Sequence, residues 1–232
     1  MLKQIIALGG GGFSMEPENP ALDTYILNQC SKKTPKICFV GTASGDAESY
    51  IERFYQAYNA FDCIPSHLSL FKPPSGDLES YVMDKDIIFV GGGSTKNLVA
   101  LWKEWGLDKI LYKAWNEGII LSGISAGSIC WFEEGVTDSY GDLTDIKALG
   151  FLPGSNCPHY DGEKDRRPVY TRMIKDQVLS PGYAADDGAA LHFIGTDLHA
   201  AVSSRPDAKA YYVRPADGGF QEEEIAIKNL QP

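Results

Sequence analysis

The sequence predicts an α/β fold: a mostly parallel sheet with helices on both faces, and short antiparallel strands near the C-terminus. Three features support this prediction: short apolar runs, a glycine-rich turn after each run, and segments of helical periodicity between them. The 232 residues, 44% hydrophobic and 22% charged, have an ordinary globular composition. Because single α/β domains often reach this length, we expect one domain over residues 1–232.

The runs expected to form parallel strands are Gln4–Leu8, Ile37–Val40, Asp86–Val90 and Ile119–Leu121, with His67–Phe71 as a further candidate. Near-continuous apolar character is typical of strands buried on both faces. Ligands of open α/β sheets bind beyond the carboxyl ends of the strands. The glycine-rich turns that follow these strands therefore mark the edge where chemistry is expected.

Helical spacing of apolar side chains is found between the strands, around residues 22–29, 50–58, 98–105 and 110–115. Residues 133–190 differ, because they are rich in Asp, Gly and Pro, and Val169–Val178 is the one clear helix there. Residues 190–213 are expected to form short antiparallel strands, of which Tyr211–Val213 is the clearest.

Charge and cysteine content exclude several classes of protein. The excess of 31 acidic over 21 basic residues gives a net charge of −10. An acidic surface repels phosphates and anionic lipids, so neither nucleic acid nor a membrane is an expected partner. The uncharged stretch Gly118–Phe132 is too short to span a bilayer. The five cysteines lack CxxC spacing, so we expect buried, reduced thiols in a cytoplasmic protein.

A nucleophile is indicated by Gly123-Ile-Ser125-Ala-Gly127, which matches G-x-S-x-G. The pattern follows an expected strand and precedes Ile129–Phe132, where we expect a helix to start. In this setting the serine occupies a strained turn with its hydroxyl exposed, and the next N–H, that of Ala126, faces a developing oxyanion.

The loop Gly91-Gly-Gly93-Ser-Thr also follows an expected strand. It lacks both nucleotide-binding glycine patterns, so phosphate binding is disfavoured. The N–H of Gly92 or Gly93 is instead the expected second oxyanion donor. The run Gly9–Gly12 is a weaker version of this signal, and we interpret it as structural.

A serine nucleophile needs a base, and His159 is the best candidate because it lies in the rigid loop Asn156-Cys-Pro-His-Tyr-Asp161. The other histidines, His67, His192 and His199, lie in expected strands or the polar tail and are interpreted as structural. The third member should be a carboxylate that orients the imidazole. Asp187 is favoured, its neighbour Asp186 competes, and Asp161 is a third possibility.

Taken together, the segments Phe89–Thr95, Gly123–Gly127, Pro158–Tyr160 and Asp186–Leu191 resemble peptidase E, the aspartyl dipeptidase family to which cyanophycinases are related. The resemblance covers roughly residues 1–200. It implies a fold like the class I glutamine amidotransferase domain, with serine in place of cysteine at the elbow. It also implies catalysis without metal or cofactor, and cleavage after an N-terminal aspartate.

By this resemblance Ser125 would be the nucleophile, His159 the base and Asp187 the acidic third member. Gly92 or Gly93 and Ala126 would form the oxyanion hole. The segment Arg166–Arg172 corresponds to the family's arginine-bearing segment, and Arg167 is chosen to bind the substrate's side-chain carboxylate, since the arginine fork matches a carboxylate.

The chain departs from the family in reading GGGST where GGGNT is expected, and in having aspartate where the best-known members have glutamate. From the resemblance, we expect a serine dipeptidase for small peptides with N-terminal aspartate. A homodimer is compatible with the sequence. Two alternatives stay open: a hydrolase of another amide, such as a cyanophycin-like polymer, and a non-catalytic binding module of the same fold.

Overall fold

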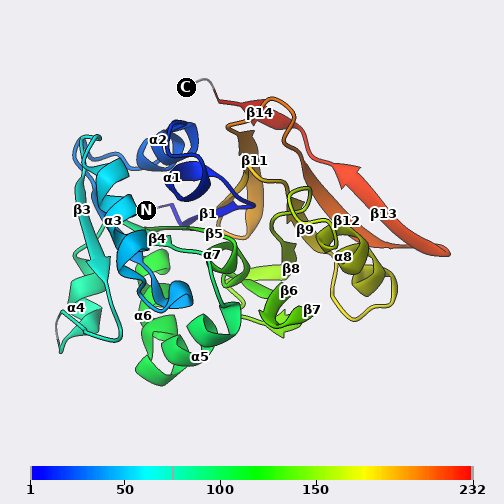
Figure 1. The fold of residues 1–232 in the computed structure, drawn as a ribbon, viewed down its shortest axis with the longest axis horizontal. Coiled ribbons are helices and arrows are strands. Elements are labelled where there is room, and N and C mark those ends of the chain that lie inside the picture. The colour runs from blue at the N-terminus through cyan, green and yellow to red at the C-terminus, as the bar shows by residue number, and fades with distance from the viewer. Residues whose placement is uncertain (1, 75, 231–232) are drawn as a thin grey trace.

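A central sheet organises the computed structural model, which describes residues 2–74 and 76–230 (Figure 1). Its strand order is β14-β11-β10-β1-β5-β4-β2-β3. The parallel strands are β1 (Gln4–Leu8), β2 (Lys36–Val40), β3 (Ile64–Leu68), β4 (Ile87–Val90) and β5 (Ile120–Ile124). The sheet continues beyond β1 with β10 (Ala189–Ile194), β11 (Asp197–Ser203) and β14 (Ile227–Asn229). Because β10 is antiparallel to β1, the C-terminal part of the chain returns to the N-terminal strand.

Helices cover both faces of this sheet. One face carries α1 (Gly12–Met15), α2 (Ala21–Leu27) and α3 (Glu48–Tyr58). The other carries α4 (Leu78–Met83), α5 (Thr95–Trp105) and α6 (Leu107–Asn116). Side chains of β1 alternate between the two cores, Ile6 and Leu8 facing the first and Ile5 and Ala7 the second. The strands are therefore buried on both sides, as their apolar runs predict.

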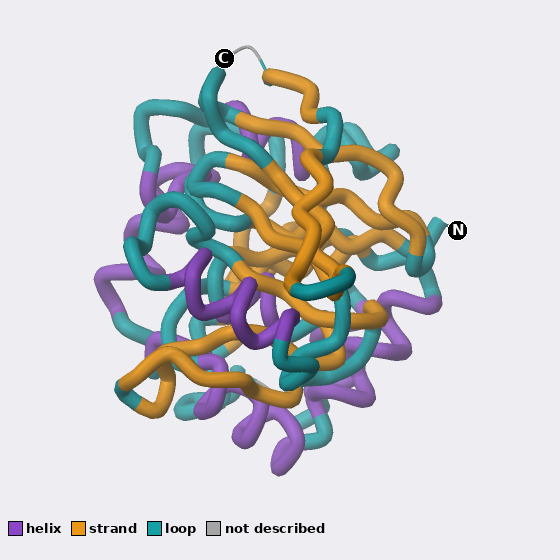
Figure 2. Tube along the Cα trace, turned by 90° about the vertical axis from the view of Figure 1, so that its right-hand side faces the viewer, coloured by secondary structure: helices purple, strands orange, loops and turns teal. Residues whose placement is uncertain are grey.

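A second sheet, of order β13-β12-β9-β8-β6-β7, lies beside the first (Figure 2). Its strands are β6 (Phe132–Tyr140), β7 (Asp142–Lys147), β8 (Leu152–Cys157), β9 (Gly182–Ala185), β12 (Ala210–Ala216) and β13 (Gly219–Glu224). The helix α8 (Arg166–Lys175) packs on it through Tyr170 and Ile174, in a core shared with Val136 and Val213. Four of its strands lie between residues 132 and 185, where the sequence indicates one clear helix, and β12 contains the predicted strand Tyr211–Val213.

The fold class is confirmed, while several element boundaries are not. A helix starting at Ile129–Phe132 is wrong: α7 (Ala126–Ile129) is a single turn, and β6 begins at Phe132. A short apolar run fits a buried strand as well as a helix, which explains the error. The further strand is β3 rather than His67–Phe71, since Phe71 is exposed after the strand has ended. Similarly, α8 begins three residues before Val169.

Candidate active site

Ser125 lies at the junction of β5 and α7 with φ 58° and ψ −116°, a strained conformation for a residue with a side chain. Glycines permit this turn because the backbone segments meet closely. A Cβ on Gly127 would lie 2.2 Å from the carbonyl oxygen of Val90, and one on Gly123 2.3 Å from the carbonyl oxygen of Gly127. The structure therefore has the geometry of a nucleophile elbow at Ser125.

His159 follows β8, also with a positive φ of 54°. Its Nδ1 lies 2.6 Å from Oδ1 of Asp187, and each side chain is only 12% exposed. A hydrogen bond from Nδ1 to a carboxylate leaves Nε2 as the ring nitrogen free to accept a proton. The pair thus has the arrangement expected of a general base and its orienting acid.

The end of β1 brings these residues to one place. The N–H of Ser125 donates to the carbonyl of Leu8 at 3.3 Å, and the N–H of His159 donates to the carbonyl of Gly9 at 3.1 Å. Gly10 forms a parallel bridge with Asp187. Three consecutive residues therefore hold the serine, the histidine and the aspartate at the carboxyl edge of the sheet. Among the described residues no hydrogen bond joins Ser125 Oγ to His159, and in free enzymes this bond often tightens only when substrate binds.

Asp186 and Asp187 form an acidic turn, and only one of these two carboxylates contacts the histidine. Asp187 contacts His159, whereas Oδ2 of Asp186 accepts the N–H of Lys209 at 2.9 Å. Burial raises the pKa of Asp186 to about 6. Asp161 contributes differently, because its Oδ1 accepts the N–H of Asp187 at 2.8 Å. Asp161 therefore supports the turn that carries Asp187.

The glycine run Gly9–Gly12 is partly explained by this turn. A Cβ on Gly9 would lie 2.4 Å from the carbonyl oxygens of residues 185 and 186, and one on Gly10 would lie 2.0 Å from Asp187 Oδ1. These glycines allow β1 to approach the acidic turn, in agreement with the structural role expected of them.

The loop at residues 91–93 lies directly beside the elbow. A Cβ on Gly92 would be 3.2 Å from Cβ of Ser125 and 3.7 Å from its Oγ, so any side chain there would crowd the hydroxyl. The N–H of Gly92 donates to the hydroxyl of Tyr50 at 3.3 Å. Ala126 is the first residue of α7, and the N–H groups of a first helical turn lack intrahelical acceptors. The structure thus places Gly92 against Ser125, with Gly93 and Ala126 as the next residues along the two chain segments.

Arg167 is paired with a residue that sequence reasoning missed. Its Nη2 donates to Glu222 of β13 at 2.9 Å, and its guanidinium lies 5.2 Å and 5.0 Å from the ring centroids of Tyr160 and Tyr211. The hydroxyl of Tyr160, the residue after His159, also donates to Glu222. The Glu222 carboxylate raises the pKa of Arg167. No local signal in the run of glutamates in β13 distinguishes Glu222 from its neighbours.

The remaining histidines and cysteines have structural surroundings. His67 bonds to Tyr55, and His192 bonds to Tyr25 and Gln4 in the interior, where burial lowers the pKa of its imidazole to about 4. The cysteines are free, although Cys30 and Cys63 are only half-buried rather than buried as expected. Burial raises the pKa of Cys157 to about 12, so its thiol is a poor nucleophile at neutral pH.

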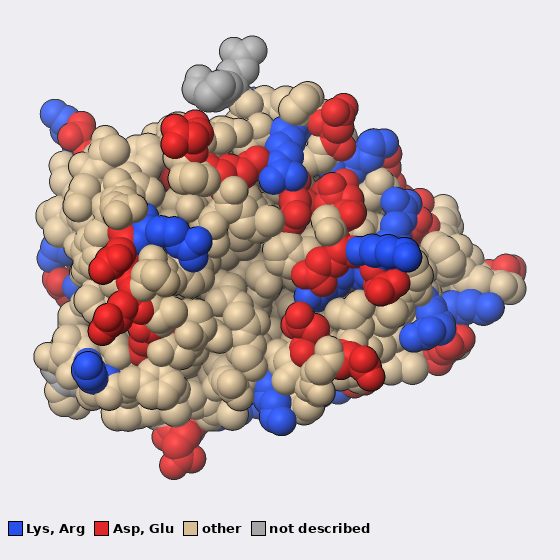
Figure 3. All heavy atoms as spheres, in the orientation of Figure 1, with Lys and Arg blue, Asp and Glu red and all other residues tan. Residues whose placement is uncertain are grey.

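Charge is distributed unevenly over the face of the molecule drawn in Figure 3. In Figure 3 charged side chains of both signs gather over the second sheet and α8, while the middle of the face is largely uncharged and hollowed. The described residues contain no cluster of three or more His, Cys, Asp or Glu side chains arranged to hold a metal ion. Within the same residues, no helix combines the length and apolar character required to cross a membrane.

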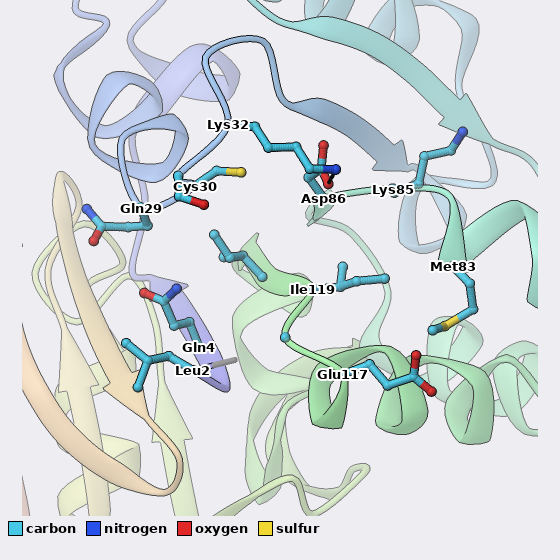
Figure 4. A pocket seen from close by; sticks show the side chains of 13 residues that line it. Leu2, Gln4, Gln29, Cys30, Lys32, Met83, Lys85, Asp86, Glu117 and Ile119 are labelled. Atoms are coloured by element: carbon cyan, nitrogen blue, oxygen red, sulfur yellow. Dashed lines mark hydrogen bonds and ion pairs between the residues drawn. The ribbon is translucent and has the colours of Figure 1, made fainter.

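A further pocket of about 460 Å³ lies at the opposite edge of the main sheet (Figure 4). It is bounded by Gln4 and Ile120, where β1 and β5 begin, and by Asp86, which precedes β4. Its charged side chains are partly neutralised, since Lys32 pairs with Asp86 at 2.6 Å. The elbow follows the carboxyl ends of the same strands, so this pocket is separate from the candidate active site.

A serine on a strained turn, attached to the same strand end as a histidine–carboxylate pair, is an arrangement typical of serine hydrolases as a class. The sequence pattern of peptidase family S51 matches residues 5–201, so the chain belongs to this family and is a peptidase.

Known relatives agree with this assignment. The chain is 63% identical over 229 residues to the "Uncharacterized peptidase YgaJ" of Bacillus subtilis (strain 168), covering 99% of this chain and 100% of that protein. A peptidase from an acI-B1 Actinobacterium has a similar structure, with a TM-score of 0.73, 18% identity and coverage of 98% of this chain and 95% of the other. A Listeria monocytogenes EGD-e protein assigned as a peptidase E has a TM-score of 0.64 at 19% identity, over 85% and 97% of the two chains. These two similarities show the shared fold.

Proposed function

We propose that the protein is a serine peptidase that hydrolyses short peptides with an N-terminal aspartate, using Ser125, His159 and Asp187 as a triad. The observation that carries the proposal is the attachment of these residues to Leu8, Gly9 and Gly10, together with the 2.6 Å contact between His159 and Asp187. Because one strand end fixes all three, their relative positions do not depend on a flexible loop.

In the proposed mechanism, Oγ of Ser125 attacks the scissile carbonyl while Nε2 of His159 takes its proton. The N–H of Ala126 and one N–H of the 91–93 loop bind the oxyanion. His159 then gives the proton to the leaving amine, and an acyl-enzyme remains. Water attacks this ester with His159 again as base, which regenerates Ser125. Asp187 keeps the imidazole oriented and stabilises its charged form.

The test is hydrolysis of an Asp–Leu dipeptide by wild type and by Ser125→Ala. Loss of the hydroxyl should lower kcat by about 10⁴- to 10⁶-fold, as expected when a triad serine is removed. Labelling of Ser125 by a fluorophosphonate in the wild type would show that the serine is reactive. Undiminished turnover by Ser125→Ala would refute the serine mechanism.

Arg167 is the residue proposed to bind the substrate aspartate. One of its nitrogens, Nη2, donates to Glu222 and its side chain is 48% exposed, so further N–H donors of the guanidinium remain available for a second carboxylate. Its guanidinium lies over the ring of Tyr160, the residue after His159, which supports this choice. An aspartate side chain would thus share the guanidinium with Glu222.

Arginine variants separate this role from general electrostatic attraction. Arg167→Met should lower kcat/KM for Asp–Leu by about 10- to 100-fold, as expected for loss of a charge-assisted hydrogen bond, with a much smaller effect on Ala–Leu. Arg53→Met is the comparison, because Arg53 lies over the ring of Tyr50 at 4.9 Å and forms no ion pair among the described residues. If Arg53→Met lost the preference for aspartate and Arg167→Met kept it, the proposed role of Arg167 would be wrong.

A further inference from the structure

Tyr50 lies in the first turn of α3, and its hydroxyl reaches the catalytic edge. It accepts the N–H of Gly92 at 3.3 Å and lies 2.7 Å from Oγ of Ser14. The residue is only 7% exposed, so the hydroxyl is held inside the protein rather than in solvent. It therefore links α1 and α3, which contact each other, to the glycine loop beside Ser125.

The ring of Tyr50 is fixed as firmly as its hydroxyl. Its centroid lies 5.0 Å from that of Phe39 and 5.8 Å from that of Phe13, both in the buried core under α1 and α3. A Cβ on Gly91 would be 3.0 Å from Cε1 of Tyr50, so the loop backbone rests directly on the ring. Movement of the Gly91–Gly92 peptide towards α3 is thus blocked.

The other end of the loop is held by the turn η1 (Thr42–Ser44). The N–H of Ser94 donates to the carbonyl of Ala43 at 2.8 Å. Gly93 has a φ of +136°, and a Cβ there would lie 2.2 Å from the same carbonyl oxygen. With Gly92 bonded to Tyr50 and Ser94 bonded to Ala43, the N–H between them, that of Gly93, has no acceptor among the described residues.

We infer that Tyr50 is a positioning residue of the oxyanion hole: its hydroxyl occupies the N–H of Gly92 and fixes the loop so that the N–H of Gly93 binds the oxyanion with that of Ala126. The inference rests on the proposed serine mechanism and adds a residue to it. Among the described residues no hydrogen bond joins Tyr50 to Ser125 or His159. Tyr50 acts only through the direction of one peptide group.

Tyr50→Phe tests the inference, because it removes the hydroxyl and keeps the ring. The matched control is Tyr55→Phe on the same helix, whose hydroxyl bonds to Nδ1 of His67 at 2.8 Å. Loss of a direct oxyanion donor costs about 10²- to 10³-fold in kcat, so a misdirected donor should cost ~10- to 100-fold. We expect this loss in kcat and in the acylation rate for Tyr50→Phe, with KM unchanged, and no change for Tyr55→Phe.

Two inhibitors distinguish oxyanion binding from general damage to the site. An aspartyl aldehyde forms a hemiacetal with Ser125 whose oxygen occupies the oxyanion hole, whereas free aspartate binds without forming an oxyanion. Tyr50→Phe should weaken the aldehyde by the same factor as kcat and leave aspartate binding unchanged. Equal weakening of both ligands, or an unchanged aldehyde affinity, would overturn the inference.

The result is independent of the test of the serine mechanism. Retained turnover in Ser125→Ala refutes the mechanism, whereas a normal Tyr50→Phe beside an inactive Ser125→Ala refutes only the role of Tyr50. Should Tyr50→Phe fail to fold, Ser14→Ala removes the second partner of the hydroxyl. This variant should weaken the aldehyde and not aspartate, and an unchanged aldehyde affinity would again contradict the inference.

Discussion

The candidate site has two sides: the nucleophile side, which comprises Ser125 and the loop at residues 91–93, and the base side, which comprises His159 and Asp187. The two sides are held at the same edge of the main sheet by different contacts. On the nucleophile side, glycines let backbone meet backbone: Gly127 lies against the carbonyl of Val90, and Gly93 against that of Ala43. On the base side, the side chains of His159 and Asp187 are held by a hydrogen bond to each other, while their backbones are attached to Gly9 and Gly10, residues far away in sequence.

This difference indicates which changes each side tolerates. A close backbone contact cannot relax without moving a strand or a helix, so damage to the nucleophile side should appear as lost stability. A side chain held by a hydrogen bond can turn away while the fold persists. Damage to the base side should therefore appear as lost activity in a protein that is still folded.

On the base side, the largest effect should come from Asp187→Asn. The amide can donate to Nδ1 of His159 and so favours the wrong tautomer, which should lower kcat by ~10³- to 10⁴-fold with little change in Tm. Steady-state kinetics and thermal denaturation measure the two quantities. Asp186→Asn is the matched control, because Asp186 bonds to the backbone of Lys209 instead of the histidine. A greater loss in the Asp186 variant would reverse our assignment of the third member.

Gly10→Ala and Gly127→Ala compare the two sides directly. The new Cβ at position 10 would lie 2.0 Å from Oδ1 of Asp187 and must push this carboxylate away from His159. Because a displacement of about 1 Å can cost ~10²-fold in rate, kcat should fall by that order with a modest fall in Tm. At position 127 the Cβ would meet the carbonyl of Val90, so we expect a loss of about 1–3 kcal/mol in the free energy of unfolding.

Urea denaturation and kcat, measured on both variants, decide the comparison. Gly219→Ala serves as control, since a Cβ there meets nothing within 4 Å. A Gly10 variant that loses more stability than the Gly127 variant while keeping its activity would contradict the predicted difference between the two sides.

The same difference explains how much the sequence predicts. The elbow and the loop at residues 91–93 are visible because strand, glycines and serine are contiguous, and the parallel strands are visible as apolar runs. In the second sheet only the segment Tyr211–Val213 of β12 is predicted, because strands such as β13 are exposed and rich in glutamate, without an apolar face to mark them. Tyr50 carries no signal beyond the apolar stripe of its helix, and its contact with Gly92 spans 42 residues. Glu222 is equally hidden, because its partner Arg167 is 55 residues away.

A smaller effect is expected from a buried acid that lies outside both sides, Asp23 in α2. It is 2% exposed and accepts a hydrogen bond from the hydroxyl of Tyr58 at 2.8 Å. Burial raises its pKa from 3.8 to about 6. The folded protein therefore holds this proton more tightly than the unfolded chain, so the contribution of Asp23 to stability falls as the pH rises from about 4 to above 6.

Asp23→Asn keeps an acceptor for Tyr58 and cannot ionise. We expect the variant to be more stable than wild type at pH 7.5, by on the order of 1–3 kcal/mol, and the difference to vanish near pH 4. Urea denaturation at pH 4, 5.5 and 7.5 measures this dependence. Catalysis should change little, because Asp23 contacts neither Ser125 nor His159 in the structure. A wild type that is the more stable protein at pH 7.5 would mean that the Tyr58 hydrogen bond outweighs the cost of burying the charge.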